Sequence, residues 1–580
     1  MIKRLAASIR QYKLCAFLTP LFILFEAVME VVIPTLMANL IDYGIELGDM
    51  GTVLKYGVIL FGCALISLGC GFASAYFGAK FSAGYGANLR HDIFHKVQDF
   101  SFANIDKFSS ASLVTRLTTD VANVQNAFVM VLRGAVRSPA LLIFSVIMAA
   151  RIRPTMCFIY LGALPILALM MYLLMSKTHP IMEKVFRTYD KLNRVIAENL
   201  HGVRVVKSFV REDHEIGKFN GVSGDIYNYF VTAEKRIILN SPVLNAVVYT
   251  CMLLISWFGA KAIVASGNDP AIGMTAGQLT SMFTYTIQIL AALMMFSMIF
   301  MMLIITRASM ERIDEIIREE PTLKSPENAL TEVPDGSIRF ENVSFRYSEK
   351  AELNALSGID LEIHSGETIG ILGGTGSAKS TLVQLIPRLY DVSEGRILVG
   401  GHDVREYDLR TLRDKVAMVL QKNELFSGTV SENLRWGNEN ATNEELVRVC
   451  KLAQADEFVQ EFPDGYDTKI EQGGTNVSGG QKQRLCIARA LLKTPKILIL
   501  DDSTSAVDTH TDALIRKAFR EELPDVTKLI IAQRIASVED ADRVLILDGG
   551  KVVGFDTPEN LMKNNTIYQE VAASQKKGGN

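Results

Sequence analysis

The sequence has little of what marks a secreted, metal-binding or nucleic-acid-binding protein. Its seven cysteines include no C-x-x-C pair, and five of them lie in or beside apolar runs. We interpret them as small buried hydrophobic residues of a reducing compartment, not as disulfides or metal ligands. The formal net charge of −3 gives no indication of a nucleic-acid partner. No signal peptide is evident, because the apolar run behind the basic N-terminus is too long and lacks a small-residue cleavage site.

The N-terminal half carries an excess of hydrophobic residues. The 580 residues predict two or more domains, and the hydrophobic content of 49% is high for a chain with 21% charged residues. A helix that crosses a bilayer needs about 20 mostly apolar residues. The sequence predicts an α-helical transmembrane bundle over residues 1–317, with six spans at roughly 14–40, 53–78, 134–152, 155–175, 240–264 and 279–305. Several runs are longer than a crossing requires, so their helices should continue into water.

Cationic residues predict the orientation of these spans. The loop at 42–52 has no Lys or Arg, whereas the connections at 79–133 and 176–239 are rich in both. Because cationic loops stay on the cytosolic side, we expect both long connections and both chain ends in the cytosol, and a multi-pass location in the cytoplasmic membrane of a prokaryote. Arg151 and Arg153 oppose this rule but are outnumbered. The basic start, MIKRLAASIRQYK, predicts a short helix at the cytosolic interface.

Two features within the spans suggest a substrate cavity. Glu26 and Glu30 lie four residues apart, hence on one helix face, and a carboxylate at membrane depth is costly enough to suggest a functional site. The alternative is that they pair with a neighbouring helix or sit beside a water-filled cavity. The sixth span is rich in methionines, including Met294 and Met298. Their flexible thioethers suit either varied apolar ligands or contact with lipid.

The soluble half begins after residues 318–337, whose three prolines predict a linker. The sequence ETIGILGGTGSAKSTLVQLI then indicates a strand, a Gly-rich turn and the start of a helix. It fits the pattern G-x-x-x-x-G-K-[ST], except at one position, and the backbone N–H groups of that pattern cradle phosphates. The residues expected around the phosphates are Gly373, Gly374, Thr375, Gly376, Ser377, Ala378, Lys379, Ser380 and Thr381.

Three residues of this loop have specific expected roles. Lys379 would reach the β- and γ-phosphates, and the Ser380 hydroxyl would ligate Mg²⁺. Ala378 stands where the pattern has glycine, so its methyl group can crowd the closest approach of the phosphate. We expect binding to survive, because alanine can adopt right-handed helical angles.

Two further motifs follow in order. VSGGQKQR contains Ser478, Gly479, Gly480 and Gln481 before a helix, which indicates either a second anion site or only a helix cap. ILILDD is a buried strand that ends in Asp501 and Asp502. A strand of this kind presents one carboxylate to Mg²⁺ and the next to the attacking water, and the second is normally glutamate.

Together these motifs resemble the ATP-binding cassette (ABC) family, and the resemblance extends over nearly the whole chain. It implies an α/β P-loop nucleotide-binding domain over residues 338–574, with ATP and Mg²⁺ as cofactors, and a disordered tail at 575–580. In addition to the motifs above, it implies that Tyr347 stacks on adenine and that Gln421 is the Mg²⁺-linked residue of the glutamine loop. It places Asp508 in the loop that crosses the dimer, and Gln533 at the position of the switch histidine.

The six spans fused ahead of the domain are similar to an exporter half-transporter of the multidrug and lipid type. This resemblance implies short coupling helices near Phe102–Phe108 and Val210–Phe219, and alternating access driven by closure of two nucleotide-binding domains. Each nucleotide then lies between the phosphate loop of one domain and the signature of the other.

Two departures predict a degenerate nucleotide site. Replacing glutamate by Asp502 withdraws the carboxylate by about one C–C bond, roughly 1.5 Å, and misplacement by about 1 Å can cost about 10²-fold in rate. Gln533 can donate a hydrogen bond to a γ-phosphate but carries no charge. We therefore expect a heterodimer, in which the partner half-transporter retains the catalytic glutamate and the switch histidine.

Two other functions stay open: a slow homodimeric exporter, and an ATP-binding membrane switch that transports nothing. An importer is disfavoured, since its membrane and ATPase parts are usually separate chains. Drug-like amphiphiles, lipids and peptides all fit a Met-rich cavity with acidic groups, although no peptidase domain precedes the spans.

Overall fold

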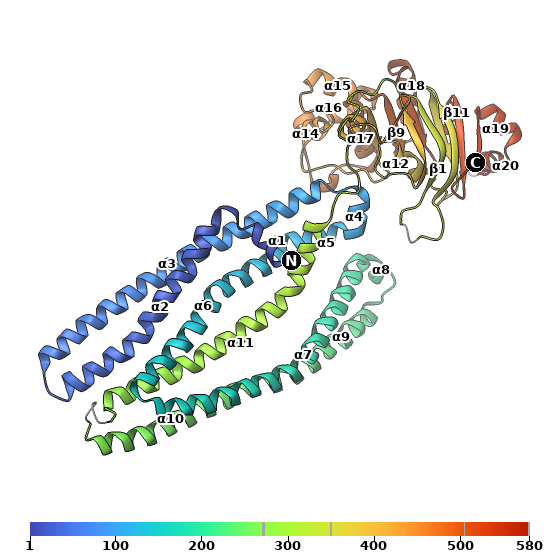
Figure 1. Ribbon diagram of the computed structural model, residues 1–580. Coiled ribbons are helices and arrows are strands. Elements are labelled where there is room, and N and C mark those ends of the chain that lie inside the picture. The colour runs from blue at the N-terminus through green and yellow to red at the C-terminus, as the bar shows by residue number, and fades with distance from the viewer. Residues whose placement is uncertain (269–272, 349–350, 504, 578–580) are drawn as a thin grey trace. The chain divides into compact units, whose positions relative to one another are not determined.

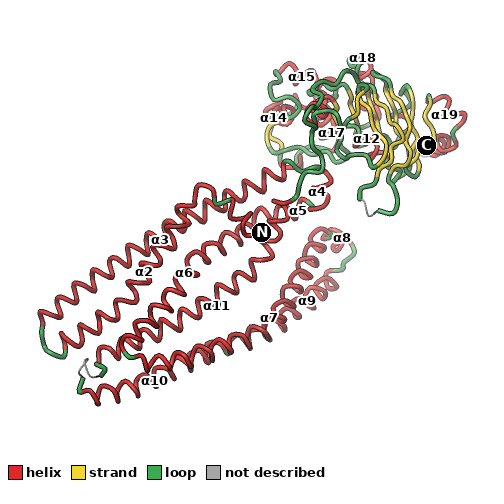
Figure 2. Tube along the Cα trace, viewed as in Figure 1, coloured by secondary structure: helices red, strands yellow, loops and turns green. Residues whose placement is uncertain are grey.

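The computed structural model describes residues 1–268, 273–348, 351–503 and 505–577. The chain forms two compact units. The helical unit comprises Met1–Val97 and Ala111–Arg318, and the α/β unit comprises Gln98–Ser110 and Glu319–Asn580. Figure 1 labels the elements, and Figure 2 shows that the strands lie in the α/β unit.

Long helices carry all six predicted spans. They are α2 (Lys13–Leu40), α3 (Met50–Gln98), α6 (Val121–Ile152), α7 (Cys157–His201), α10 (Asn240–Ser266) and α11 (Ala276–Arg318). The longest, α3, has 49 residues, which at 1.5 Å per residue is about 70 Å and more than twice the hydrocarbon thickness of a bilayer. Helix α3 is therefore long enough to continue beyond a membrane, as expected for an apolar run longer than a crossing requires.

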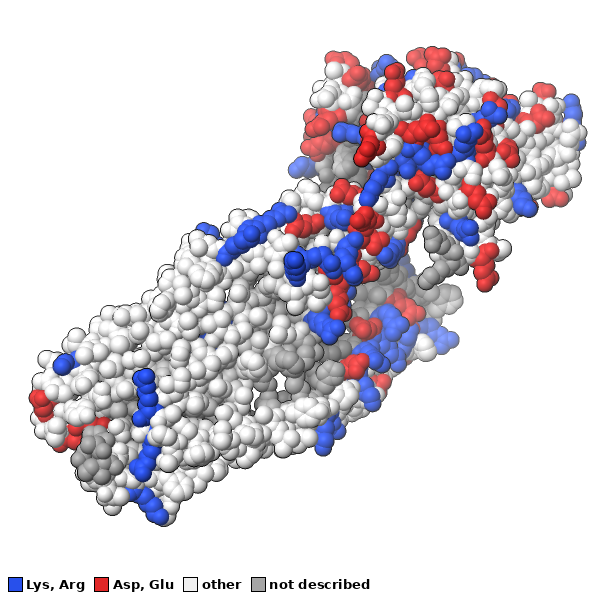
Figure 3. All heavy atoms as spheres, in the orientation of Figure 1, with Lys and Arg blue, Asp and Glu red and all other residues white. Residues whose placement is uncertain are grey.

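Within the described residues, five segments are long and apolar enough to cross a membrane: Arg10–Ile45, Met50–Gln98, Ser110–Ile152, Glu212–Ser266 and Ala276–Phe296. The fourth predicted span coincides with a shorter apolar segment, Pro154–Met170, at the start of α7. In Figure 3 the middle of the helical unit is almost free of charged side chains, which gather near its two ends.

Short elements complete the ends of the long helices. They are α1 (Ile2–Ala7), α4 (Phe102–Phe108), α5 (Ser110–Thr115), α8 (Val203–Ser208), α9 (Glu212–Ile237), the 3-10 turns Arg10–Tyr12 and Pro154–Met156, and the π-helical turns Ile41–Ile45 and Arg116–Asp120. At the N-terminus, Arg4 of α1 donates two hydrogen bonds to the buried Asp314 of α11, at 2.7 and 2.8 Å. The basic N-terminal helix is thus anchored by an ion pair.

Of the two expected coupling helices, the structure contains the first as a separate short helix but not the second. Helix α4 has the bounds expected for the first, and the Ser101 side chain starts it through a capping box. The second expected helix, near Val210–Phe219, is not a separate short helix. Val210 adopts a left-handed φ of 50° in the turn between α8 and α9, and residues 212–219 open the long α9. Acidic residues in the first turn of α9 stabilise a helix start at that point.

The α/β unit contains two larger sheets and one small one. The first is antiparallel, in the order β2 (Leu356–Ile363), β1 (Ile338–Phe345), β4 (Glu394–Val399) and β5 (His402–Asp403). The second has the order β12 (Lys551–Asp556), β11 (Arg543–Asp548), β3 (Thr368–Leu372), β10 (Thr527–Ile531), β9 (Ile497–Asp501) and β6 (Val416–Val419), and only its edge strand β12 is antiparallel. The small sheet pairs β7 (Gly428–Thr429) with β8 (Lys469–Ile470).

Beyond Glu319, the α/β unit also contains nine helices among its described residues. They are α12 (Lys379–Leu385), α13 (Leu409–Lys415), α14 (Val430–Arg435), α15 (Asn443–Leu452), α16 (Asp456–Gln460), α17 (Gly479–Leu491), α18 (Thr509–Glu522), α19 (Pro558–Asn564) and α20 (Thr566–Lys577), with 3-10 turns at Gly465–Asp467, Gln472–Gly474 and Ile535–Ser537. Of these helices, α14, α15 and α16 group to one side of the sheets (Figure 1). The central strands β9 and β10 are buried along their whole length, as expected for parallel strands covered on both faces.

The register of the parallel strands sets the position of the candidate site. Strand β10 lies between β3 and β9, and Ile531 pairs with Ile371 on one side and with Asp501 on the other. The carboxyl ends of these three strands therefore lie level at one edge of the sheet. In open α/β sheets ligands bind at this edge.

The segment at 319–337 and the C-terminal tail have more structure than the sequence indicates. Leu330 exchanges backbone hydrogen bonds with Glu406 and Asp408. Helix α20 continues through Lys577, so the disordered tail expected at 575–580 does not begin at 575, and residues 578–580 lie outside the described residues. The Gln575 side chain donates to Gln533 O at 2.7 Å and accepts from Ile535 N at 2.9 Å, which ties α20 to the loop after β10.

Candidate functional site

The Gly-rich loop lies between β3 and α12. Gly373 is required for steric reasons, because a Cβ there would lie 2.2 Å from the carbonyl oxygen of Leu547. The Lys379 ammonium donates to Gly373 O and Gly374 O at 2.8 and 2.9 Å. These two hydrogen bonds hold the lysine side chain against the backbone of the loop. Thr375 and Gly376 are exposed at the tip of the loop. Burial lowers the pKa of Lys379, since desolvation disfavours its charged form.

Ala378 does not have the backbone conformation that we expected. It has φ 69° and ψ 27°, which is left-handed, at the position before α12. A non-glycine residue held in this region costs about 1–3 kcal/mol. The turn, not the residue, determines the backbone angles, so the alanine at the glycine position carries strain in addition to a methyl group.

Ser380 and Asp501 form a hydroxyl–carboxylate pair below the loop. Ser380 Oγ donates to Asp501 Oδ1 at 3.0 Å, and Asp501 is only 3% exposed. Burial raises the pKa of the Asp501 carboxyl, and the nearby Asp502 adds to the rise. Mg²⁺ takes oxygen ligands and is usually held by one or two protein side chains together with phosphates and water. The pair fits that role, because a divalent cation would compensate a buried carboxylate.

Asp502 and Gln533 bond to each other. Gln533 Nε2 donates to Asp502 Oδ2 at 2.8 Å. Asp502 has a left-handed φ of 50°, and its backbone N–H donates to Ile531 O at 3.2 Å. These two departures, which are the ones expected to weaken hydrolysis, are thus brought together in space, although 31 positions separate them in sequence.

The signature residues form the N-terminus of α17. Ser478 caps the helix by accepting from Gln481 N at 3.3 Å, while the Gln481 side chain accepts from Ser478 N at 2.9 Å. A Cβ on Gly480 would lie 2.9 Å from Ala506 O, whereas one on Gly479 would make an ordinary 3.5 Å contact. Gly480 is therefore sterically required, and Gly479 has space for a side chain.

Gln483, which sequence reasoning missed, joins α17 to the loop before α18. Its side chain donates to Ser505 Oγ at 3.3 Å and accepts from Ala506 N at 3.0 Å. The residue follows the signature by two positions, which is the only sequence signal for it. Asp508 ends the same loop and caps α18 by accepting from Thr511 N at 2.9 Å, and this bond lowers the pKa of Asp508.

Tyr347 follows β1 and is 53% exposed. Its hydroxyl shares a 2.8 Å hydrogen bond with Thr381 Oγ1 in α12, which links it to the phosphate loop. The Tyr390 ring, a second residue missed in the sequence, contacts the Tyr347 ring edge-on at 5.4 Å between centroids. The Tyr390 hydroxyl donates to Asp106 of α4 at 2.7 Å. Tyr390 thus connects the predicted adenine platform with the first predicted coupling helix.

Gln421 lies two residues after β6 and is exposed. The residues on either side of it, Leu420 and Lys422, line a groove of about 400 Å³. Phe426 and Trp436 stack at 4.0 Å between ring centroids in the same groove. An apolar groove thus lies directly beside the predicted glutamine loop.

The acidic pair in the membrane segments bonds to an arginine. Arg137 of α6 donates to Glu26 Oε1 at 2.7 Å and to Glu30 Oε2 at 2.9 Å. Sequence reasoning missed Arg137, although an ionisable residue within an apolar run was a usable signal. Of the two predicted methionines, Met294 is 45% and Met298 64% exposed. Met298 lines a cavity of about 430 Å³, together with Arg137.

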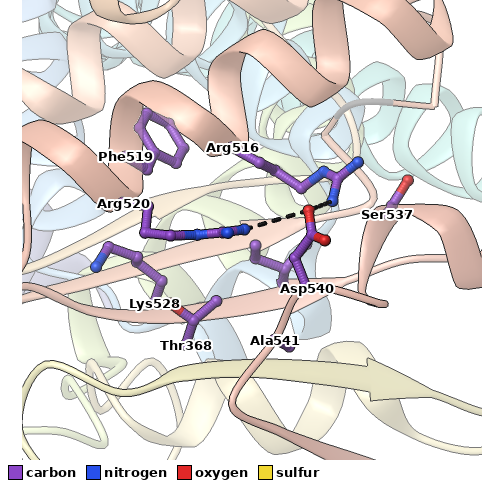
Figure 4. A pocket seen from close by; sticks show the side chains of 9 residues that line it. Thr368, Arg516, Phe519, Arg520, Lys528, Ser537, Asp540 and Ala541 are labelled. Atoms are coloured by element: carbon purple, nitrogen blue, oxygen red, sulfur yellow. Dashed lines mark hydrogen bonds and ion pairs between the residues drawn. The ribbon is translucent and has the colours of Figure 1, made fainter. Parts of the chain in front are cut away.

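A second, very small cavity in the α/β unit lies at the opposite edge of the parallel sheet. Thr368 and Lys528 are level with each other near the amino ends of β3 and β10. Arg516 and Arg520 of α18 reach Asp540 at 2.5 and 3.2 Å (Figure 4). The cavity holds about 20 Å³, room for about one water molecule. It is therefore no part of the candidate nucleotide site.

Comparison with known proteins identifies the family. Residues 16–310 match the family of the ABC transporter transmembrane region, and residues 356–505 match the ABC transporter family. The chain is 34% identical over 574 residues to the uncharacterized ABC transporter ATP-binding protein YfiB of Bacillus subtilis, covering 99% of this chain and 98% of that protein. It is 35% identical over 582 residues to the uncharacterized protein MT1311 of Mycobacterium tuberculosis, with the same coverage.

The fold agrees with a solved structure. A bacterial Atm1-family ABC exporter with ATP bound has a TM-score of 0.80 and 22% identity, covering 98% of this chain and 99% of that one. The chain belongs to the ABC transporter family, and it has the fold of an ABC exporter. The predicted fold class, a transmembrane helical bundle fused to an α/β P-loop domain, is confirmed.

Proposed function

We propose that this chain is one half of an ATP-driven exporter that moves amphipathic compounds across the cytoplasmic membrane by alternating access. We further propose that it contributes the degenerate nucleotide site of a heterodimer. ABC exporters work as dimers in a lipid bilayer, with ATP bound by the cassette domains. The proposal concerns the partner, the unequal sites and the cargo.

The observation that carries the proposal is the bond between Asp502 and Gln533. A catalytic base must lie within hydrogen-bond reach of the water that it orients. The Asp502 carboxylate is shortened by one methylene, and it already accepts a hydrogen bond from the Gln533 amide. The aspartate in place of glutamate and the glutamine in place of histidine both weaken hydrolysis. The hydrogen bond between Asp502 and Gln533 also occupies the groups that would act on the water and the γ-phosphate. A site of this kind holds nucleotide better than it hydrolyses it.

The other residues of the site suit nucleotide retention. Mg²⁺ bound between phosphates would supply the charge that stabilises phosphoryl transfer. Ser380 and Asp501 would hold that ion, Lys379 would contact the phosphates, and Tyr347 would stack on the base. Ala378 is strained but leaves the loop closed around the lysine, because Lys379 bonds to two loop carbonyls.

The intact signature is suited to binding the phosphates of the nucleotide held by the partner chain. The capping box between Ser478 and Gln481 fixes the start of α17, so its first N–H groups are oriented for an anion. Gly479 and Gly480 keep this surface free of side chains. A chain without a role in hydrolysis by a partner would not need such a surface.

The groove beside Gln421 suits reception of a cytosolic extension. Its stacked Phe426 and Trp436 are 46% and 63% exposed, and exposed aromatic rings in a groove mark an interaction site. Phe209 and Val210, at the turn between α8 and α9, are 73% and 80% exposed. We infer that such a turn from the partner chain docks in this groove. Through this contact, nucleotide binding would move the membrane helices.

Two other functions predict different biochemistry. A slow homodimeric exporter would have two weakened sites and would hydrolyse ATP without another chain. A membrane switch would bind ATP and move no cargo. The intact signature and the aromatic groove favour a hydrolysing heterodimer over the switch.

The test compares three substitutions in the complex purified from its native membranes through a tag on this chain. We expect Gly479→Asp to reduce ATP turnover by about 10²-fold, since charge opposite a phosphate reverses an interaction whose loss alone costs about 10²–10³. Gly479→Asn is the matched neutral control of the same size and should cost much less. Asp502→Asn should change turnover less than about twofold.

Two results would contradict the proposal. If Asp502→Asn reduces turnover as strongly as Gly479→Asp, then Asp502 is a working base and the degenerate-site assignment is wrong. If the purified complex contains this chain alone and still hydrolyses ATP, the homodimer replaces the heterodimer. Gly480 is unsuitable for this test, because a side chain there also meets the carbonyl oxygen of Ala506 at 2.9 Å.

A further inference from the structure

Arg133 places a cation beside an apolar cavity within a membrane segment. The cavity of about 430 Å³ lies among α2, α3, α6 and α11, and its lining includes Met130, Met298 and Ile299. Its size is that of a small-molecule site, for which 300–1,000 Å³ is typical. Among the described residues that line it, Arg133 and Arg137 are charged and none is acidic.

The two arginines differ in their partners. They lie four residues apart on α6 and therefore on one face. Arg137 is bonded to both Glu26 and Glu30. Within the described part of the chain, no ion pair joins Arg133 to an acidic residue. Its Cδ lies 3.9 Å from the position of a Cβ on Gly78 of α3, so its stem lies beside that helix, and the residue as a whole is exposed.

An arginine without an acidic partner is unexpected at this position. A cation in a transmembrane segment is costly, and such residues normally pair or mark a substrate pathway. The segment Ser110–Ile152 that contains Arg133 is long and apolar enough to cross a membrane. A ligand with a negative charge can therefore supply the counter-charge that Arg133 lacks among the described residues.

We propose that this cavity binds an amphiphile with a single anionic group, a carboxylate, sulfonate or phosphate. This proposal rests on the exporter function above and specifies its cargo. The guanidinium of Arg133 would pair with the anion through two parallel hydrogen bonds. The apolar chain would lie along Met130, Met298 and Ile299. The nearby Asn126 amide also lines the cavity and adds a polar group beside the anion.

The charge pattern disfavours a cationic cargo at this place. The carboxylates that could attract a cation are engaged by Arg137, and neither lines the cavity. A cationic head would instead meet Arg133. The acidic pair that the sequence offers as a substrate site thus acts through Arg137, while the neighbouring cation faces the ligand.

The test measures binding of two fluorescent probes to the complex purified from native membranes and held in phosphatidylcholine nanodiscs. The probes are a dansyl-labelled undecanoate and its trimethylammonium counterpart with the same chain and label. We expect the anionic probe to bind at least tenfold more tightly, with an affinity that falls as salt is added. A second arm replaces phosphatidylcholine by phosphatidylglycerol. Competition there identifies an anionic lipid as the source of the head group, and its absence identifies a soluble amphiphile.

Two substitutions isolate the role of Arg133. Arg133→Gln should weaken binding of the anionic probe by at least tenfold, and Arg133→Lys should retain part of it. Arg151→Gln removes a cation from the other end of the same helix and should leave binding unchanged. Equal affinity for both probes, or no effect of Arg133→Gln, would overturn the proposal. ATP turnover of the same samples is the separate test of the exporter function, because an active ATPase with no charge preference refutes only the cargo.

Discussion

The two units differ in how their shielded carboxylates are paired: Glu26 and Glu30 in the helical unit are partly exposed, and Asp501 in the α/β unit is buried. In the helical unit, Glu26 and Glu30 both accept from Arg137 within 2.9 Å. In the α/β unit, Asp501 is 3% exposed and accepts from the neutral hydroxyl of Ser380, while the nearest cation, Lys379, bonds to loop carbonyls. A carboxylate paired within the protein has its charge compensated, and removal of its partner would be destabilising. A carboxylate that lacks a cation is suited to a ligand that brings one.

The same contrast occurs within the helical unit. Arg137 has its counter-charges, and Arg133, one turn away, has none among the described residues. Residue type alone does not separate these cases, because all four side chains are charges in a costly environment. The partners distinguish them, and the partners lie on other helices.

The largest expected effect follows from breaking the paired cluster. Arg137→Gln leaves two carboxylates close together without a cation. Breaking a buried ion pair costs about 3–5 kcal/mol, and these side chains are partly exposed, so we expect a loss of about 2–4 kcal/mol. The measurement is the fraction of monodisperse protein that survives detergent extraction and heating.

A charge-free variant controls for this result. The triple variant Glu26→Gln, Glu30→Gln, Arg137→Gln removes all three charges and should recover much of the stability. If Arg137→Gln is as stable as the wild type, the ion cluster is not structural and the carboxylates are free for a ligand.

The second prediction concerns the unpaired carboxylate. Burial raises the pKa of Asp501 above its usual value of 3.8. A raised pKa in the folded state means that this group favours folding only while protonated, and the contribution is lost as the pH rises through the folded-state pKa. At neutral pH, ionised Asp501 therefore opposes folding of the nucleotide-free protein.

Asp501→Asn should consequently stabilise the nucleotide-free protein at pH 7. We expect a rise in melting temperature of roughly 2–4 °C, the effect of about 1 kcal/mol in a domain of this size. The rise should shrink as the pH is lowered through the folded-state pKa, where the wild-type carboxyl takes up a proton. The stabilisation by Mg²⁺ and ATP should be lost in the variant. A variant less stable than the wild type at pH 7 would show that Asp501 supports the fold.

Local sequence signals predicted what depends on neighbours along the chain. The apolar runs predicted the long helices, because a run of about 20 apolar residues is typical of a transmembrane helix. The order of motifs placed the phosphate loop and Asp501 at one sheet edge, since parallel strands share a carboxyl edge. The bounds of α4 followed from its match to an exporter extension.

Contacts between distant residues could not be predicted in this way. The bond between Arg137 and Glu26 spans 111 positions, and the bond between Tyr390 and Asp106 spans 284. The left-handed angles of Ala378 are imposed by the turn, whatever the residue preference. These features depend on tertiary packing, and a single sequence does not show which helix faces lie opposite each other.

The third prediction tests the aromatic platform. Tyr347→Ala should weaken ATP binding at this chain's own site by about fivefold, because an aromatic stack contributes on the order of 1 kcal/mol. Tyr347→Phe keeps the ring but loses the hydrogen bond to Thr381, so it separates stacking from positioning of the loop. The measurement is photolabelling by an azido-ATP analogue at this chain. Equal labelling of wild type and Tyr347→Ala would place the base elsewhere.

The smallest expected effect is at Ala378, where the loop departs from the family pattern but the backbone does not adapt. Its left-handed φ of 69° is strained for alanine and unstrained for glycine. Relief of about 1–3 kcal/mol of strain is partly offset by the greater freedom of glycine in the unfolded chain, about 0.4–1 kcal/mol. Ala378→Gly should thus stabilise the α/β unit by about 1 kcal/mol and tighten ATP binding severalfold, because the methyl group at the phosphate is also removed. If the site is degenerate as proposed, the variant should leave ATP turnover of the complex nearly unchanged, since Asp502 and Gln533 are still present. Thermal melting and turnover of the same sample measure both effects, and a large gain in turnover would mean that the loop, not the Asp502–Gln533 pair, makes the site weak.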